Sequence, residues 1–119
     1  MLEDRRNLNR YFLEKKSEDE LKSFINIGGV EIKISPDNLS QSGINFKLNI
    51  EAAGKISAQS SLKFKFILDN SFEVNALGKI IWKTKISGSG NDYYSLGFHL
   101  FISEQKEQKY FEDFLNTLE

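Results

Sequence analysis

Apolar and polar residues alternate along most of the chain beyond residue 23. In LKFKFIL (62–68) every even-numbered residue is apolar, and two of the odd-numbered residues are lysines. Such an alternation, with a period of two, predicts a β-strand that buries one face. The same pattern, bounded by turn residues, predicts further strands at 23–27, 30–34, 43–48, 72–86 and 93–101.

Turn-forming residues separate these predicted strands. Gly28-Gly29 predicts one tight hairpin and Asp69-Asn70 another, because these residue types tolerate positive φ. Gly78 stands inside the longest strand, where a glycine predicts a bulge or a bend. The strands are therefore expected to pair as antiparallel neighbours.

The C-terminal segment 103–119 follows a different period. Its apolar residues recur at i, i+1, i+4, i+5 and i+8, the spacing of one stripe of an amphipathic α-helix, with Ser103 as the expected N-cap. The stripe consists of Tyr110, Phe111, Phe114, Leu115 and Leu118. The expected fold is therefore mainly β: a six-stranded antiparallel β-barrel with a C-terminal α-helix that covers an open edge or mouth.

Length and charge indicate one soluble domain. The chain has 119 residues and a formal net charge of −1, which gives no support for bulk binding to nucleic acid or to a membrane surface. The charged N-terminus does not resemble a secretory signal, and no apolar run approaches the ~18 residues of a membrane span. A cytoplasmic protein without membrane insertion is expected.

Candidate catalytic and metal-binding residues are scarce. There is no cysteine, and the one histidine, His99, is expected on a sheet surface rather than in a metal site. SGSG (87–90) lacks the lysine and the strand-to-helix context of a phosphate-binding loop, and no GxSxG motif is present. Trp82 has apolar neighbours and is expected in the core. We therefore expect no enzyme activity and no cofactor.

All arginines of the chain lie within six residues, at Arg5, Arg6 and Arg10, whereas every other basic residue is a lysine. Arginine is planar, always charged, able to donate two parallel hydrogen bonds and able to stack on flat rings. A flat anionic ligand such as a nucleotide would use all of these properties. The alternative is a solvated tail whose arginines pair with Glu3 or Asp4.

A second polar stretch, DNLSQSG (37–43), connects two predicted strands. Asn38 offers an acceptor to the N–H edge of guanine, and Ser40 offers a hydroxyl to a phosphate oxygen. Gly43 permits a positive φ or a close approach of the backbone to a ligand. The alternative is an ordinary Asx-turn within a hairpin.

These two stretches, an RxxxR pattern at residues 6–10 and [D/N]xSxxG at residues 38–43, together resemble the paired motifs of the PilZ domain family. GKIIWK (78–83) and LGFHLF (96–101) also resemble strands of that family. The resemblance implies a six-stranded barrel with a C-terminal helix that binds the bacterial second messenger cyclic di-GMP. It also implies a flexible N-terminal arm at 1–22, which carries RxxxR, and a barrel with its helix at 23–119.

The resemblance assigns roles to individual residues. Arg6 and Arg10 would bind guanine and phosphate, and an arginine before RxxxR, here Arg5, accompanies capture of an intercalated pair of ligands. The implied ligand-binding residues are Arg5, Arg6, Arg10, Asn38, Ser40 and Gly43.

The hypothesis is a receptor and adaptor in which cyclic di-GMP orders the arm and alters binding to an unidentified partner protein, with no DNA or RNA ligand. One alternative is a PilZ-like interaction module that does not bind nucleotide. Another is a small barrel that binds single-stranded nucleic acid through lysines and aromatic side chains.

Overall fold

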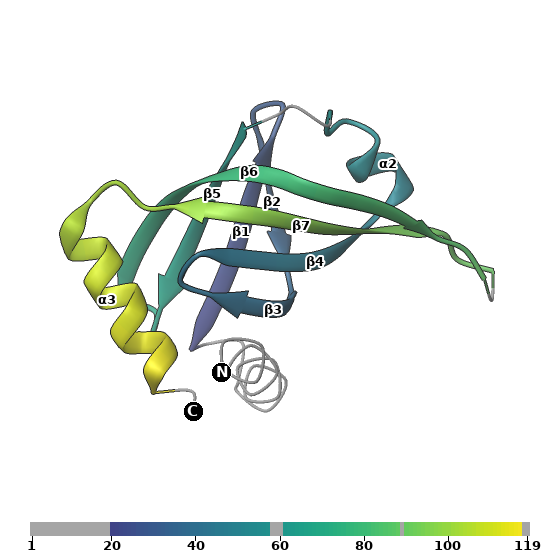
Figure 1. Ribbon diagram of the computed structural model, residues 1–119. Coiled ribbons are helices and arrows are strands. Elements are labelled where there is room, and N and C mark those ends of the chain that lie inside the picture. The colour runs from purple at the N-terminus through teal and green to yellow at the C-terminus, as the bar shows by residue number, and fades with distance from the viewer. Residues whose placement is uncertain (1–19, 58–60, 89, 118–119) are drawn as a thin grey trace.

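The computed structural model describes residues 20–57, 61–88 and 90–117. The three arginines fall outside these ranges, so their predicted roles stay predictions. Seven strands and two helices are described (Figure 1). They are β1 (Leu21–Ile27), β2 (Val30–Ile34), β3 (Pro36–Ser40), β4 (Gly43–Asn49), α2 (Ile50–Ala53), β5 (Ser61–Leu68), β6 (Phe72–Ile86), β7 (Tyr93–Phe101) and α3 (Gln105–Asn116).

All seven strands belong to one antiparallel sheet with the order β2-β1-β5-β6-β7-β4-β3. The prediction of a mainly β, barrel-like fold with a C-terminal helix is confirmed, but the count of six strands is one too low. The additional strand is β3, which lies within the stretch expected to be a polar connection. Pro36 begins this edge strand, a position where a missing N–H disturbs little of the ladder.

The two edge strands of the sheet, β2 and β3, are consecutive in the chain and are joined by Ser35 alone. One residue can connect opposite edges only if the sheet curls strongly, as Figure 1 shows. Within the described residues no ladder of hydrogen bonds joins β2 to β3, so the sheet is an open half-barrel rather than a closed barrel.

The two predicted hairpin turns are confirmed. Gly28 and Gly29 have φ of 59° and 86°, and Asp69 and Asn70 have φ of 52° and 59°. Two consecutive residues with positive φ form the turn whose twist matches that of the adjoining strands. In the first turn Asn26 adds a side-chain hydrogen bond, because its Oδ1 accepts from the N–H of Gly29 at 3.1 Å.

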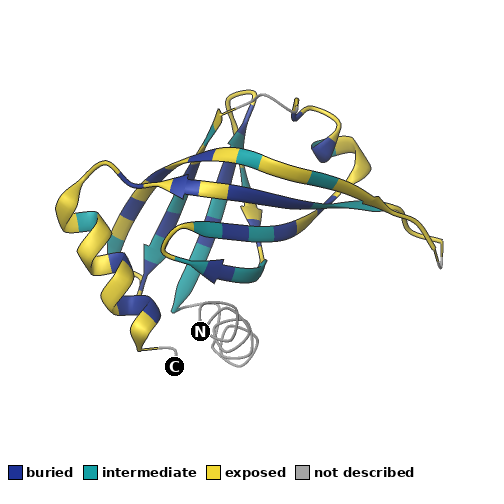
Figure 2. Ribbon diagram, viewed as in Figure 1, coloured by how far each residue is buried: buried dark blue, intermediate teal, exposed yellow. Residues whose placement is uncertain are grey.

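The concave face of the sheet holds the core, as the alternation of residues predicts (Figure 2). Its centre is a cluster of phenylalanine rings. Phe64 meets Phe46 and Phe98 edge to face, with ring centroids 6.0 and 5.1 Å apart, and Phe66 stacks on Phe111 of α3 at 5.0 Å. Such contacts each stabilise by about 0.5–1.5 kcal/mol beyond the buried area.

The prediction of a bulge or bend at Gly78 is wrong, because the register of β6 shifts between Ile80 and Trp82 instead. Gly78 itself pairs regularly with Leu62 and Leu100. A Cβ placed on Gly78 would overlap the ring of Phe64. The glycine is therefore required by packing in the core rather than by a bend of the strand.

Helix α3 covers the first residues of β6, which have no described strand on one side, and so covers an open edge as expected. The first residues of β6 extend past the end of β7, and there Glu107 of α3 accepts a hydrogen bond from the N–H of Asn75 at 2.6 Å. Tyr110 stacks on Phe72 with centroids 3.9 Å apart. The predicted N-cap at Ser103 is wrong by one residue, because the helix is capped by the backbone of Glu104 without a side-chain hydrogen bond.

The expected apolar stripe of α3 packs on the sheet of the same chain. Phe111, Phe114 and Leu115 are buried, whereas Tyr110 stays 40% exposed and Leu118 lies outside the described residues.

Candidate functional site

The outer face of β3, β4, β7 and β6 carries a row of side chains that runs straight across four strands. Asn38 on β3 pairs with Asn45 on β4, Asn45 pairs with Gly97 on β7, and Gly97 pairs with Trp82 on β6. Directly paired residues of antiparallel strands have Cβ atoms about 4.5–5.5 Å apart. The register therefore brings together four residues that are up to 59 positions apart in sequence (97 − 38).

A second row lies beside the first. Ser40 pairs with Gly43, Gly43 pairs with His99, and His99 pairs with Lys79. His99 and Lys79 are exposed, in agreement with the expectation that the histidine lies on a sheet surface. The three predicted ligand residues within the described chain, Asn38, Ser40 and Gly43, thus occupy adjacent positions on one face.

The two rows line a hollow of about 130 Å³, here called the outer pocket. Its floor is the sheet itself, so backbone and short side chains form most of its base. The lining residues are Asn38, Ser40, Ser42, Gly43, Ile44, Asn45, Ile81, Trp82, Gly97, Phe98 and His99.

Two amide oxygens in the outer pocket are buried without a partner. Asn38 Oδ1 and Asn45 Oδ1 accept no hydrogen bond from any described residue. A buried acceptor without a donor costs about 1–3 kcal/mol, so native structures rarely keep one. Donors for these two oxygens must therefore come from beyond the described residues. An Asx-turn is contradicted, because Asn38 Oδ1 would then accept a local N–H.

Ser40 carries the side-chain contacts of the β3–β4 turn. Its Oγ accepts from the N–H of Ser42 at 3.4 Å and donates to the carbonyl of Gly43 at 3.5 Å. Both distances exceed the usual range of about 2.5–3.2 Å, so the hydroxyl is held only weakly. A stronger acceptor such as a phosphate oxygen would compete well for its proton.

Gly43 does not have a positive φ, which corrects one of the two expectations for this residue. Space inside the protein does not explain the glycine either, because an added Cβ would lie 3.4 Å from the carbonyl oxygen of Phe98, an ordinary contact. The close approach of a ligand to bare backbone at Gly43 stays a prediction.

The expectation that Trp82 lies in the core is wrong, since its side chain is 39% exposed on the outer face. Regular alternation from the half-buried Ile80 would point Trp82 inward. The bulge between these residues inserts Ile81 and reverses the parity, so Trp82 faces out and its indole lies over Gly97. A Cβ on Gly97 would overlap the indole. Together they form a flat aromatic wall of the outer pocket.

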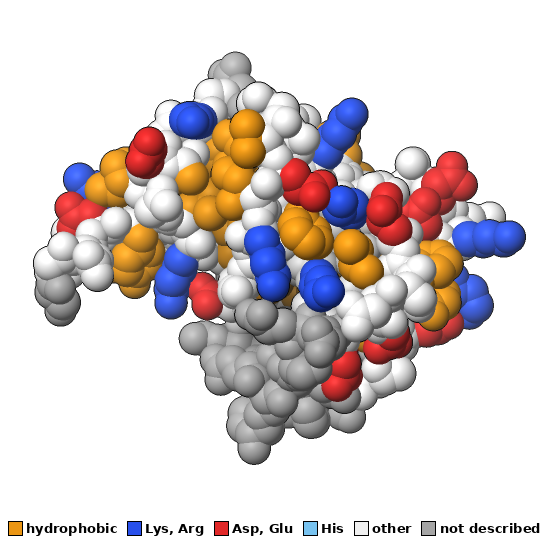
Figure 3. Space-filling view, turned by 180° about the vertical axis from the view of Figure 1, so that it is seen from behind, with side chains coloured by type: hydrophobic (Ala, Val, Ile, Leu, Met, Phe, Trp, Pro, Cys, Tyr) orange, Lys and Arg blue, Asp and Glu red, His pale blue; other side chains and the backbone are white. Residues whose placement is uncertain are grey.

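Charged side chains lie near the outer pocket without filling it. Lys47 follows Asn45 on the same face of β4 and forms an ion pair with Asp37, with Nζ 3.7 Å from Oδ2. Lys47 Nζ also lies 5.7 Å from the centroid of the Tyr93 ring. Elsewhere basic and acidic side chains are interspersed, as Figure 3 shows for the reverse side of the molecule. That described surface has no continuous basic groove of the kind a lysine-based nucleic-acid site requires.

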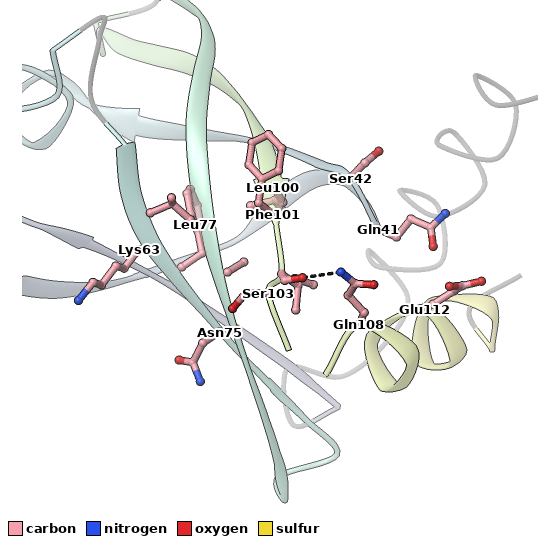
Figure 4. A pocket seen from close by; sticks show the side chains of 13 residues that line it. Gln41, Ser42, Lys63, Asn75, Leu77, Leu100, Phe101, Ser103, Gln108 and Glu112 are labelled. Carbon is pink, nitrogen blue, oxygen red and sulfur yellow. Dashed lines mark hydrogen bonds between the residues drawn. The ribbon is translucent and has the colours of Figure 1, made fainter. Parts of the chain in front are cut away.

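A second, larger hollow borders the outer pocket and is here called the helix groove. Figure 4 shows β6 and β7 on one side, α3 on another and the β3–β4 turn on a third. Its floor includes Leu77 and Phe101, which are 46% and 52% exposed. Gln108 of α3 donates to the carbonyl of Ile102 at 2.5 Å and fixes the entry into the helix. Ser42 lines both hollows, so the two sites share an edge.

Other kinds of site find no support in the described residues. No group of three acidic, histidine or cysteine side chains within them could hold a metal ion. Across the same ranges, no helix has the length and apolarity needed to span a bilayer.

Sequence reasoning predicted only Asn38, Ser40 and Gly43 among the residues of the outer pocket. Four of those it missed lie in the two rows: Asn45, Trp82, Gly97 and His99. For Asn45, Gly97 and His99 the sequence did contain a signal, because residues two apart in a strand lie on the same face. Asn45 shares a face with Gly43, and Gly97 shares one with His99. The register that places these two strands side by side is a tertiary property. For Trp82 there was no such signal, because the bulge is not evident in GKIIWK (78–83).

Comparison with known proteins identifies the fold and the family. The model of the PilZ domain family matches residues 5–115. Among solved structures, MrkH of K. pneumonia in its apo state matches with a TM-score of 0.68 and 15% identity, over 83% of this chain and 46% of that one. The Bacillus subtilis inhibitor of motility, MotI/DgrA, matches with a TM-score of 0.63 and 13% identity, over 82% of this chain and 46% of that one.

A third structure, the Borreliella burgdorferi PlzA protein in complex with c-di-GMP, matches with a TM-score of 0.58 and 11% identity, over 97% of this chain and 55% of that one. The chain thus spans about half the length of these proteins. No curated protein sequence matches it. Because the family match spans nearly the whole chain and the structural matches have the same fold, the chain belongs to the PilZ domain family.

Proposed function

We propose that this protein is a cyclic di-GMP receptor and that the outer pocket holds a guanine of the ligand. The observation that carries the proposal is the pair of buried, unpartnered amide oxygens beside Ser40 and Gly43. Guanine presents N–H donors on its Watson–Crick edge and therefore supplies what these acceptors lack. Membership of the PilZ family and the likeness to PlzA, whose structure contains c-di-GMP, support the same ligand.

The phosphates of the ligand require cationic partners, and the proposal assigns them to Arg5, Arg6 and Arg10. Arginine can pair with a phosphate bidentately and stack on a purine at the same time. Ser40 adds a hydroxyl from the barrel side. Gly43 leaves bare backbone against which the ribose-phosphate can lie. No cofactor takes part.

The proposed mechanism is a ligand-dependent switch in which the segment before β1 acts as an arm. The predicted arm of residues 1–22 is shortened, because Leu21 and Lys22 already pair with β5. This arm binds cyclic di-GMP together with the sheet, so the ligand changes the surface that a partner protein meets. The helix groove shares Ser42 with the outer pocket and exposes Leu77 and Phe101, which makes it suitable for transmitting that change. The proposed setting is the cytoplasm, where a soluble adaptor could meet the nucleotide.

The number of ligands is part of the proposal. Arg5 directly precedes the RxxxR pattern, and a third arginine allows a second nucleotide to be held by stacking and phosphate contacts. We therefore propose that each protomer binds an intercalated pair of cyclic di-GMP molecules.

Isothermal titration of cyclic di-GMP into the purified chain tests the proposal. We expect micromolar or tighter binding with a stoichiometry of two, no competition by GTP, and loss of the binding heat in Arg6→Ala. Lys55→Ala is the matched control, because it removes a positive charge from an exposed side chain that lies outside both the arm and the outer pocket. An absence of heat at tens of micromolar protein would contradict the receptor function and leave a protein-interaction module. A stoichiometry of one would correct only the number of ligands.

A further inference from the structure

We infer that Asn45, which lies outside the [D/N]xSxxG pattern, is the second guanine-reading residue of the outer pocket and completes a two-acceptor site with Asn38. This inference rests on the proposed function and states how the pocket recognises the base. Each amide oxygen takes one of the two adjacent donors of guanine, the ring N1–H and the exocyclic N2–H.

The chemistry of the side chains explains the need for a second acceptor. A carboxylate at position 38 would have two oxygens and could accept from both guanine donors at once. Asn38 has a single carbonyl oxygen, and its other terminal group is itself a donor. A second oxygen must therefore come from a neighbouring residue if both guanine donors are to be matched.

Asn45 stands where that neighbour is needed. It pairs directly with Asn38 across β3 and β4, and both side chains project to the outer face between the inward-facing Leu39, Ile44 and Phe46. Both Oδ1 atoms are buried, and neither accepts a hydrogen bond from the described residues. The two residues both line the outer pocket, at paired positions about one strand spacing apart.

A purely structural role does not account for Asn45. Asparagine is disfavoured in strands, where β-branched residues fit the pleat better. The Oδ1 of Asn45 also accepts no hydrogen bond within the described chain that would offset this preference. By contrast, Asn49 on the same strand has a structural role, because its Oδ1 accepts from the N–H of Ala52 at 2.8 Å and caps α2.

Titration with two ligands tests the inference. Cyclic di-IMP keeps the N1–H of each base but lacks the N2 amine, so its affinity relative to cyclic di-GMP reports recognition of that amine. We expect the intact protein to prefer cyclic di-GMP about tenfold, the effect of one hydrogen bond to a buried acceptor. Asn45→Ala should weaken cyclic di-GMP binding about tenfold. One of Asn38→Ala and Asn45→Ala should abolish the preference for the amine, and the other should retain it.

Repeating the Asn45→Ala substitution in the Asn38→Asp variant sharpens the test. In Asn38→Asp the carboxylate supplies two oxygens, so the penalty of Asn45→Ala should shrink to less than about threefold. Asn75→Ala is the matched control, since it removes an exposed amide on β6 that bonds to Glu73 and lines no part of the outer pocket. Thermal unfolding of Asn45→Ala without ligand should show no loss of stability, whereas loss of a structural amide would lower Tm.

The outcomes separate the inference from the function on which it rests. If the intact protein binds no cyclic di-GMP, the proposed function fails and the inference fails with it. If the intact protein binds but Asn45→Ala binds equally well, only the inference is overturned. It is also overturned if Asn45→Ala weakens both ligands while neither alanine variant changes the preference for the amine. In that case a group of the protein, such as an arginine, donates to the two oxygens.

Discussion

The two faces of the half-barrel are built from the same strands but obey opposite rules. On the concave face of β4, β5 and β7, Phe46, Phe64 and Phe98 are at most 1% exposed and contact one another closely. On the convex face the neighbouring residue, Gly97, pairs with Asn45 and Trp82. There buried oxygens lack donors from the described residues, and the flat wall of the outer pocket is an exposed indole.

This difference separates stability from binding. Side chains on the concave face are buried against other residues of the same chain, so substitutions there should change the stability of the fold. In the outer pocket, by contrast, Asn38 and Asn45 keep oxygens without a donor from the described residues, and Gly43 leaves backbone open. Changes at Asn38, Asn45 and Gly43 should act on ligand binding and leave folding nearly unaffected.

Phe64→Ala should destabilise the core on the concave face and cause the largest loss in the free energy of unfolding. Phe64 is 1% exposed and contacts the rings of Phe46, Phe66 and Phe98, so truncation leaves a cavity at the centre of the core. We expect a loss of about 3–5 kcal/mol in the free energy of unfolding, measured by urea denaturation. Phe101→Ala, at a site 52% exposed, is the control and should lose much less. Equal losses would contradict the distinction between the faces.

Gly97→Ala should have an intermediate effect, because the indole of Trp82 covers this glycine of the outer pocket. The new Cβ would overlap the indole of Trp82, which must then swing away from β7. We expect a loss of stability of about 1–3 kcal/mol and a red shift of the fluorescence of Trp82, the only tryptophan.

Gly43→Ala is the matched control for this prediction. A Cβ at Gly43 has room inside the protein, so stability and fluorescence should stay unchanged while cyclic di-GMP binding weakens. An unshifted spectrum in Gly97→Ala would refute the stacking of Trp82 on β7.

Asn38→Ala should have almost no effect on folding and a clear effect on binding. The variant removes an acceptor that has no donor in the described chain, so the free energy of unfolding should change by less than about 0.5 kcal/mol. Binding of cyclic di-GMP should weaken about tenfold or more, as measured by titration. A strong loss of stability would show that Asn38 supports the fold instead.

The smallest effect should come from the convex face away from the outer pocket, where Lys65 Nζ lies 2.8 Å from Glu31 Oε2. The hydrogen bond to Glu31, and then the charge of that carboxylate, raise the pKa of Lys65 above its usual value of 10.5. Because the pKa is higher in the folded state, the resulting stability is fully present below the unfolded pKa and is lost as pH rises through the folded one.

Urea denaturation at several pH values checks this point. The difference in stability between the intact protein and Glu31→Gln should be small and constant from neutral pH to about pH 10, and it should vanish above that. A difference that persists well above pH 11 would show that charge on Lys65 is not its source.

Much of the fold was predictable because its signals are local. The alternation in LKFKFIL (62–68) and the period of the C-terminal segment predict strand and helix from residues close in sequence. Gly28-Gly29 and Asp69-Asn70 predict their turns, because few other residue types adopt positive φ. The strand β3 was missed because its polar residues Asn38 and Ser40 read as a connection, and only pairing with β4 makes them an edge strand.

The sequence by itself determined the alternation that separates the two faces, the helical stripe, the hairpin turns and the pair of motifs that indicated the PilZ family. Only the tertiary structure decided which residues share the outer pocket. Asn45 reaches Asn38 through strand register, and Trp82 reaches Gly97 through a single inserted residue in β6. Register and bulges depend on interactions between strands far apart in sequence, so a side chain's face is settled only when its neighbouring strand is in place.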